Sequence, residues 1–362
     1  MANENKKKIL LVDDSALMRS VLCDIINSDE RFYVQDRATN GLEALDYLRR
    51  KTYDAVVLDV NMPKMNGLEL LKALQKEKIQ ARVMMASTDT KEGAKTTLDA
   101  LELGALDFIE KPDNAAGCRV DSFRQKMISI LSVVAESKVM VSHQTINIEE
   151  MRNEKKMMEL VSKHSNKVSG NRVIAIASST GGPKALQSVI PKIPAGIKAP
   201  IVLVQHMPSG FTASLAERLD SLSEVKVKEA VEGDVLEDGV VYLSRGGSHM
   251  NVLRSPAGKH TIHYTDEPHR EGVKPCANYM YESLMNSTYD EIVCVVMTGM
   301  GADGTEGIKN LKTKKKIHVI AQEESTCAVY GMPKCVVKAA LNDQIVPLEQ
   351  IAQEIIMNVG VN

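Results

Sequence analysis

The stretch KILLVDD, residues 8–14, sets the fold of the first part of the chain. Four apolar residues followed at once by two aspartates are typical of a strand buried on both faces of a parallel sheet. Four further runs of strand length follow, namely FYVQDR (32–37), DAVVLDV (54–60), RVMMA (82–86) and LDFIE (106–110). Amphipathic stretches of helix length separate these runs. The alternation predicts an α/β fold for residues 1–130, with five βα units around a parallel sheet, a (βα)5 domain.

The same alternation resumes after a polar stretch. Residues 131–170 are rich in charged and amide side chains, so we predict an interdomain linker there, in which NIEEMRNEKKMMELV (147–161) favours a helix through its Glu/Lys pairs. Runs of strand length then return, namely RVIAIAS (172–178), APIVLVQ (199–205), EIVCVVMTG (291–299) and KKKIHVIAQ (314–322). They predict a second, doubly wound α/β domain with a mainly parallel sheet over residues 171–362. The shorter runs predict a hairpin excursion, namely VYLSRGG (241–247), HMNVLR (249–254) and HTIHYTD (260–266).

The composition excludes several classes of protein. The chain has 362 residues, of which 44% are hydrophobic and 25% charged, and its formal net charge is -2. These values predict a soluble protein of two globular domains. The sequence has no long Lys/Arg run, no secretory signal and no 18-residue apolar stretch, so we expect a cytoplasmic protein without nucleic-acid partners or membrane insertion. The six cysteines are scattered without metal-ligand spacing, and we expect reduced thiols.

Carboxylates gather at the predicted strand ends of the first domain. Asp13 and Asp14 follow the first strand, and Asp59 ends the third. The carboxyl ends of parallel strands meet at one edge of a sheet, so we expect these groups to lie close together. Three clustered carboxylates repel one another unless a cation neutralises them, and hard oxygen ligands suit Mg²⁺. The pattern therefore predicts a magnesium site.

A carboxylate at such a site can accept a phosphoryl group, provided that fixed positive charge offsets the phosphoryl oxygens. Lys111 follows the fifth strand and can supply that charge. Ser87 ends the fourth strand and can donate a hydrogen bond to a phosphoryl oxygen. Phe108 can repack in response, although an aromatic residue at that position is as often a core residue. The set predicts a phosphorylation switch.

The second domain ends its strands with a different set of side chains. Ser179 follows the first strand, His206 follows the second, and Asp303 lies in the glycine-rich turn after residues 291–299. A serine hydroxyl becomes a nucleophile when a neutral imidazole takes its proton and a carboxylate orients that imidazole. The backbone N–H of Met300, in the same turn, is our preferred donor to a developing oxyanion. The pattern predicts a serine hydrolase.

Two other classes of protein stay open on these residues. A serine in a glycine-rich turn is often structural or a phosphate contact, although the chain lacks the G-x-x-x-x-G-K-[ST] string of a P-loop. SSTGG and GMGADG could merely shape the groove of a non-catalytic, phosphorylation-dependent binding module. A DNA-binding regulator is disfavoured because the second half lacks a helix-turn-helix pattern and a basic face.

The motifs DDSALMR, LDVNMPKMNGLELL, AST and FIEKP resemble the receiver domain of two-component response regulators. The resemblance covers about the first 120 residues. It implies that Asp59 is the phosphoacceptor, and that Asp13, Asp14 and the Asn61 carbonyl surround Mg²⁺. It also implies that the conformational readout rests on three residues, namely Ser87, Phe108 and Lys111.

The motifs SSTGGP, QHMPSGF, GMGADG and YGMP resemble the catalytic domain of the chemotaxis protein-glutamate methylesterases, the CheB family, over residues 171–357. The resemblance implies that Ser179 is the nucleophile, His206 the general base and Asp303 the residue that orients it. It further implies hydrolysis of γ-glutamyl methyl esters on chemoreceptor cytoplasmic domains, deamidation of specific glutamines, a chemotaxis histidine kinase as phosphodonor, and no cofactor for the esterase. Phosphorylation is expected to release an inhibition of the second domain.

The chain departs from the family pattern at two places. It has Ala177-Ser178-Ser179 where the family commonly has Gly-Ala-Ser, and the extra Cβ of Ala177 is expected to perturb the turn modestly. We choose Ser179 as the nucleophile because it directly precedes Thr-Gly-Gly. HREGVKPCANY (269–279) is less rich in arginine than the family pattern, which puts substrate contacts there in doubt.

Overall fold

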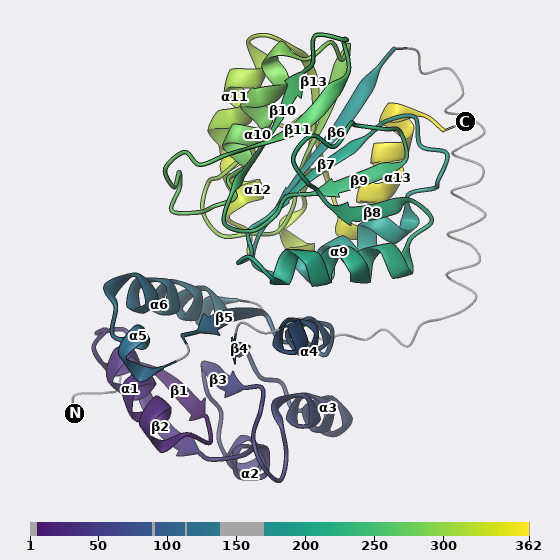
Figure 1. The fold of residues 1–362 in the computed structure, drawn as a ribbon. Coiled ribbons are helices and arrows are strands. Elements are labelled where there is room, and N and C mark those ends of the chain that lie inside the picture. The colour runs from purple at the N-terminus through teal and green to yellow at the C-terminus, as the bar shows by residue number, and fades with distance from the viewer. Residues whose placement is uncertain (1–5, 89–90, 113, 138–169, 362) are drawn as a thin grey trace. The chain divides into compact units, whose positions relative to one another are not determined.

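A parallel sheet of five strands forms the centre of the first of two units (Figure 1). Its order is β2-β1-β3-β4-β5, and its strands are β1 (Lys7–Val12), β2 (Phe32–Ala38), β3 (Ala55–Asp59), β4 (Val83–Thr88) and β5 (Asp107–Lys111). The computed structural model describes residues 6–88, 91–112, 114–137 and 170–361. Within these ranges, no helix is long and apolar enough to cross a membrane. The five predicted strands are confirmed, with ends that differ by one or two residues.

Polar residues begin the helices of the first unit. The helices are α1 (Ala16–Asn27), α2 (Gly41–Arg50), α3 (Gly67–Glu77), α4 (Lys91–Glu102), α5 (Ala115–Cys118) and α6 (Asp121–Glu136). Ser15 caps α1, Asn40 caps α2, and Asn66 forms a reciprocal capping box with Glu69 at α3. Helices α1 and α6 share a buried core with one face of the sheet, and α2, α3 and α4 follow one another across the other face (Figure 1).

Helix α6 corrects the predicted start of the linker. It runs past residue 130 to Glu136, and its residues Met127, Leu131 and Val134 are fully buried in the core of the first unit. These apolar residues recur at helical spacing, so the helix continues for as long as they reach the sheet. The predicted helix at 147–161 and most of the predicted linker lie outside the described residues.

The second unit is built on a parallel sheet of seven strands in the order β14-β13-β12-β6-β7-β9-β8. The strands are β6 (Arg172–Ser178), β7 (Ile201–Gln205), β8 (Lys226–Glu229), β9 (Val240–Leu243), β12 (Glu291–Val296), β13 (Lys316–Gln322) and β14 (Gln344–Val346). The four strands predicted for this sheet are confirmed. The central strands are apolar and almost fully buried, as expected where helices cover both faces.

Only part of the predicted excursion leaves this sheet. Strands β10 (His249–Arg254) and β11 (His260–Thr265) form an antiparallel hairpin, as predicted, whereas β9 pairs in parallel with β7 and β8. Including VYLSRGG in the hairpin was therefore wrong. The sequence reading missed β8 and β14 because strands of four and three residues carry too few positions for a recognisable pattern. The helices of this unit are α8 (Gly182–Val189), α9 (Phe211–Leu222), α10 (Ala277–Ser283), α11 (Thr305–Lys312), α12 (Met332–Lys338) and α13 (Leu348–Val359).

Both sheets reverse their strand order at one point. In the first unit the chain moves outward from β1 to β2 and then returns to β3 on the other side of β1. In the second unit it moves from β6 to β7 and later returns to β12 on the other side of β6. Crevices form beyond the carboxyl ends of the strands at such points, and both predicted sites lie there.

Candidate functional site

Three carboxylates meet at the reversal point of the first sheet. Asp13, Asp14 and Asp59 each offer an oxygen, and these oxygens lie within 4.8 Å of one another. Asp13 and Asp59 are buried, with exposed fractions of 1% and 7%, whereas Asp14 is exposed. Clustered oxygen donors with one side open to solvent fit a hard divalent cation that keeps some of its water. The structure therefore brings together the three predicted carboxylate ligands.

Lys111 lies against two of these carboxylates. Its Nζ is 2.7 Å from Asp59 Oδ1 and 3.2 Å from Asp13 Oδ2. Burial raises the pKa of the Asp59 carboxyl, and the nearby ammonium group offsets this only in part. Burial alone would lower the pKa of Lys111, but the two carboxylates raise it overall. The Lys111 side chain thus stays charged beside the predicted phosphoacceptor.

The remaining predicted residues of the first site lie on the same strand ends. Ser87 is buried at the end of β4, and its hydroxyl donates to the Gly93 carbonyl at 3.4 Å. Phe108 is buried in β5 with 6% of its surface exposed, which fits a core residue and the inward state of a switch equally. Asn61 follows β3 and is exposed.

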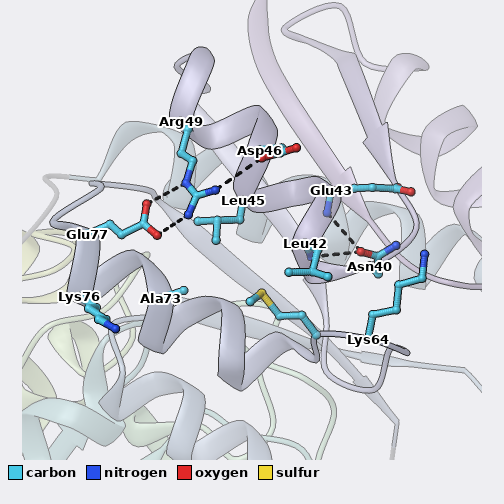
Figure 2. A pocket seen from close by; sticks show the side chains of 11 residues that line it. Asn40, Leu42, Glu43, Leu45, Asp46, Arg49, Lys64, Ala73, Lys76 and Glu77 are labelled. Carbon is cyan, nitrogen blue, oxygen red and sulfur yellow. Dashed lines mark hydrogen bonds and ion pairs between the residues drawn. The ribbon is translucent and has the colours of Figure 1, made fainter.

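A pocket of about 540 Å³ lies elsewhere in the first unit, between α2 and α3 (Figure 2). Arg49 spans one end of it, bonded to Glu77 from α3 and paired with Asp46 of its own helix. None of the predicted site residues is among its lining residues. The pocket therefore does not belong to the carboxylate cluster.

In the second unit, the strand register brings Ser179 and His206 side by side. Ser178 is paired with Gln205 across β6 and β7, and the His206 N–H donates to the Ser178 carbonyl at 3.1 Å. Neighbouring strands lie about 4.8 Å apart, so the residues that follow this pair leave the sheet as neighbours. The Ser179 N–H donates to the Thr298 carbonyl, beyond β12, at 3.0 Å. Its own N–H is therefore already engaged and is not a donor for an oxyanion.

His206 contacts Asp303 through one ring nitrogen only. Nε2 lies 2.7 Å from Asp303 Oδ2, and the ring is 8% exposed. The other nitrogen, Nδ1, is buried and has no hydrogen-bond partner in the described part of the chain. A carboxylate beside Nε2 fixes the proton there, which leaves the lone pair of neutral histidine on Nδ1. The Ser179 hydroxyl therefore makes no hydrogen bond to Nδ1 in this structure, and such bonds between a catalytic hydroxyl and its base often form only when substrate binds.

Asp303 is held by hydrogen-bond donors on both of its oxygens. Besides His206, it accepts from the N–H groups of Ala277, Asn278 and Gly304 at 2.6 to 2.9 Å and from Cys276 Sγ at 3.0 Å. Ala277 and Asn278 open α10, so Asp303 also caps that helix. Burial favours the neutral acid, but the hydrogen bond and charge of His206 and these donors hold the pKa of Asp303 below its usual value. Asp303 therefore stays ionised.

Glycines let the loops of this site approach one another closely. Gly181 has φ of 76°, in the left-handed region, and begins the turn into α8. A Cβ on Gly299 would lie 2.7 Å from the Cβ of Ser179, so the turn after β12 lies directly against the predicted nucleophile. Met300 follows Gly299 in this turn, and its side chain is 40% exposed. The predicted oxyanion donor thus belongs to a turn that contacts Ser179.

The structure shows where the residues of the two departures noted in the sequence lie. Ala177 is paired in regular register with Val204 and Val296, so the expected perturbation by its Cβ does not occur. Ser178 is fully buried, and its hydroxyl donates to Gln205 Oε1 at 2.7 Å. In the 269–279 loop, Arg270 pairs with Glu282 at 2.7 Å.

The sequence reading missed three residues that hold this site together. Gln205, Cys276 and Thr298 each contact the main chain or side chain of a predicted catalytic residue. Gln205 stands beside His206 in the QHMPSGF motif, which was the one available signal. Cys276 was expected only to be a buried thiol, and burial beside the Asp303 carboxylate raises its pKa well above the ordinary value.

Both units match models of known protein families. Residues 174–355 match the family model for the CheB methylesterase, and residues 9–118 match the response regulator receiver domain. A protein-glutamate methylesterase/protein-glutamine glutaminase of Syntrophomonas wolfei is 41% identical over 355 residues, covering 97% of this chain and 99% of that protein. A protein of the same description from Bacillus subtilis is 38% identical over 351 residues, covering 96% of this chain and 97% of its own length.

A solved structure resembles the second unit. The CheB methylesterase catalytic domain of Thermotoga maritima is 39% identical to the matched part, with a TM-score of 0.50, and the match covers 53% of this chain and all of that domain. These matches run in the same order along the chain as the two predicted domains. They confirm the resemblance drawn from the sequence motifs.

Proposed function

This chain belongs to the CheB family of protein-glutamate methylesterases and glutaminases that carry a receiver domain, and from that membership we propose how its two sites act. The second unit hydrolyses γ-glutamyl methyl esters on chemoreceptor cytoplasmic domains to glutamate and methanol, and it deamidates specific glutamines of the same receptors. The receiver unit controls this reaction and so contributes to adaptation in chemotaxis. The His206–Asp303 pair beside Ser179 carries the proposal.

The reaction starts with proton transfer from the serine. His206 Nδ1 takes the proton of Ser179 Oγ as that oxygen bonds to the ester carbonyl carbon. The carbonyl oxygen becomes an oxyanion, for which the Met300 N–H is the proposed donor. When the intermediate collapses, the C–O bond to the methoxy group breaks, and His206 gives the proton to the leaving oxygen. Methanol departs and a glutamyl ester of Ser179 remains.

Water completes the cycle by the same steps. His206 Nδ1 takes one proton from the water as its oxygen bonds to the acyl carbon. Collapse then breaks the bond to Ser179 Oγ, which receives the proton back. Asp303 keeps the other ring nitrogen protonated and offsets the charge of the imidazolium. For glutamine substrates, ammonia replaces methanol as the leaving group.

The first unit is proposed to accept a phosphoryl group on Asp59. Asp13, Asp14, Asp59 and the carbonyl of Asn61 would hold Mg²⁺, which would offset negative charge on the phosphoryl oxygens. Lys111 supplies a fixed positive charge beside Asp59, and Ser87 can turn its hydroxyl toward the phosphoryl group. Phe108 repacks with Ser87. The donor is a histidine kinase of the chemotaxis type, and the protein acts in the cytoplasm, where that kinase and the receptor domains are found.

Methanol release from methylated receptor membranes tests both parts of the proposal. The full chain is assayed with and without a small phosphodonor and Mg²⁺. We expect Ser179→Ala to lower the rate by at least about 10⁴-fold, whereas Ser188→Ala, in the last turn of α8, retains it. We expect the phosphodonor to raise the rate of the parent chain and not that of Asp59→Asn.

A serine-reactive fluorophosphonate separates the enzyme from a non-catalytic binding module. Labelling that maps to Ser179 and disappears in Ser179→Ala supports the hydrolase. A folded chain that neither labels nor releases methanol would instead identify a module whose glycine-rich turns only shape a groove. Near-parental turnover by Ser179→Ala would refute the assignment of the nucleophile.

A further inference from the structure

Gln205 joins the main chains of the proposed nucleophile and the proposed base. It is the last residue of β7, and only 1% of its surface is exposed. Its Nε2 donates to the Ser179 carbonyl at 3.0 Å and to the His206 carbonyl at 3.2 Å. One side-chain amide therefore connects the two residues whose spacing the proposed reaction depends on.

This connection extends the sheet beyond its last ladder bond. The His206 N–H donates to the Ser178 carbonyl, and from there the two chains separate into different loops. The Ser179 N–H turns toward Thr298, away from His206. The Gln205 amide joins the carbonyl groups of Ser179 and His206, which lie one step beyond this last ladder bond.

The orientation of this amide is dictated by its surroundings. Two carbonyl oxygens face one end of the amide, and only the NH₂ group can donate to both. At the other end, the buried hydroxyl of Ser178 donates to Oε1 at 2.7 Å. Rotating the amide by half a turn would place its oxygen against two other oxygens in a buried site, which is unfavourable. Ser178 therefore holds the amide in the one orientation that serves both loops.

The start of α8 leaves the amide no room to move. A Cβ on Gly182 would lie 2.0 Å from Gln205 Oε1 and 2.9 Å from its Cδ. Both distances are far below van der Waals contact, so the glycine is needed for the helix to pack against the amide. Packing and hydrogen bonding together fix Gln205 as a rigid spacer.

We infer that Gln205 is a positioning residue, oriented by Ser178, that sets the distance between the Ser179 hydroxyl and the His206 ring. The inference rests on the proposed function, because it assigns a role within that catalytic pair. Gln205 is buried beneath both loops, so it acts on the rate of the chemical step and leaves substrate binding unchanged. A misplacement of about 1 Å in such a pair can cost about 100-fold in rate.

A double-mutant cycle on the full chain tests this role. The variants are Gln205→Met, which keeps the shape and removes the amide, Ser178→Ala, and both together. We expect kcat for methanol release to fall about 100-fold in Gln205→Met and about fivefold in Ser178→Ala, with KM unchanged within about twofold. The double variant should match Gln205→Met, because Ser178 acts only through the amide. Gln344→Met removes an amide that bonds Glu354 at the sheet edge, and it should retain kcat within about twofold.

The outcomes separate the inference from the proposal beneath it. Turnover by Ser179→Ala would refute the proposed function itself. An inactive Ser179→Ala with Gln205→Met within about threefold of the parent would refute only the role of Gln205. Losses that add in the double variant, or that appear mainly in KM, would also overturn it. If Gln205→Met melts far below the parent, Ser178→Ala decides, since a fall in its kcat at an unchanged melting temperature supports the role and an unchanged kcat refutes it.

Discussion

The two sites occupy the same place in two similar sheets, yet they treat negative charge in opposite ways. In the first unit, three carboxylates lie together, the ammonium group of Lys111 contacts two of them, and the third, Asp14, faces solvent. In the second unit, one carboxylate, Asp303, is enclosed by donors on both oxygens. The first cluster is poised to take up further positive charge, whereas the second is already balanced.

This difference shows how one architecture serves two kinds of chemistry. A reversal point provides only the crevice and the converging strand ends. What the crevice does depends on whether the charge of a carboxylate is only partly offset, as at Asp59, or surrounded by donors on both oxygens, as at Asp303. The pKa shifts of these two carboxyls point in opposite directions for that reason.

The largest expected effect comes from breaking the balanced site. Asp303→Asn should lower kcat for methanol release by about 10⁴-fold, because an amide cannot hold the proton on His206 Nε2. Its NH₂ group would also face donors instead of acceptors. Asp343→Asn is the matched control, because Asp343 accepts a backbone N–H from Val319 away from the site. A loss of less than about tenfold in Asp303→Asn would show that the balance of charge is not required.

Removing divalent cations should impair the first site and leave the second unaffected, because only the first has clustered carboxylates. With a chelator in place of Mg²⁺, we expect phosphoryl incorporation from a small donor to fall by at least about 100-fold, because the carboxylate cluster then repels the phosphoryl oxygens. Methanol release without a phosphodonor should stay unchanged. Equal losses in both assays would contradict the distinction between the two sites.

The glycines that begin α3 and α8 offer a paired test of local packing. A Cβ on Gly67 would lie 2.5 Å from the Asp59 carbonyl oxygen, much as one on Gly182 would meet Gln205. Gly182→Ala should slow methanol release about tenfold by displacing the amide, and Gly67→Ala should slow phosphoryl incorporation about threefold. Gly67→Ala should leave methanol release without a phosphodonor unchanged, and Gly182→Ala should leave phosphoryl incorporation unchanged. Crossed effects would show that the sites are not locally built.

The smallest expected effects concern stability. The lowered pKa of Asp303 means that its ionised form stabilises the fold above the ordinary value of 3.8, and this contribution is lost as the pH falls through the lower folded value. The raised pKa of Asp59 means that its ionisation costs stability above the folded value. Calorimetry should therefore show Asp303→Asn melting about 5–10 °C lower at neutral pH and Asp59→Asn melting equally or a few degrees higher.

The two variants should also differ in how their melting temperatures change with pH. The gain in Asp59→Asn should shrink as the pH falls through the raised pKa of Asp59, because the parent carboxyl is then protonated too. The loss in Asp303→Asn should persist down to the ordinary value of 3.8. A gain in Asp59→Asn that grows on acidification would contradict the assigned direction.

The sequence predicted the long central strands and the residues at their ends. Asp13, Asp59 and Lys111, like Ser179 and His206, directly follow or end strands whose apolar runs are easy to recognise. Asp303 was found through the glycine-rich turn that contains it. In each case the local pattern and the topology of a parallel sheet were enough to bring distant residues together.

The rest depends on contacts that no local pattern records. Cys276 reaches Asp303 because α10 packs beside the turn after β12, and nothing in the sequence near residue 276 announces this. The roles of Ser178 and Gln205 follow from the register of β6 against β7, which a one-residue shift would destroy. The continuation of α6 was missed because its last apolar residues, Leu131, Val134 and Ala135, directly precede a long polar stretch, and only their packing in the core of the first unit shows where the helix ends.

The capping of α10 by Asp303 affects how this protein can evolve after gene duplication. Losing that carboxylate would remove the cap of a helix as well as the partner of His206, so it would harm folding and activity together. The side chain of Ser179 caps none of the helices that the structure describes. In a duplicated copy that no longer needs esterase activity, Ser179 should therefore be lost early and Asp303 kept. Such a descendant would retain His206 and Asp303 but would hydrolyse no ester.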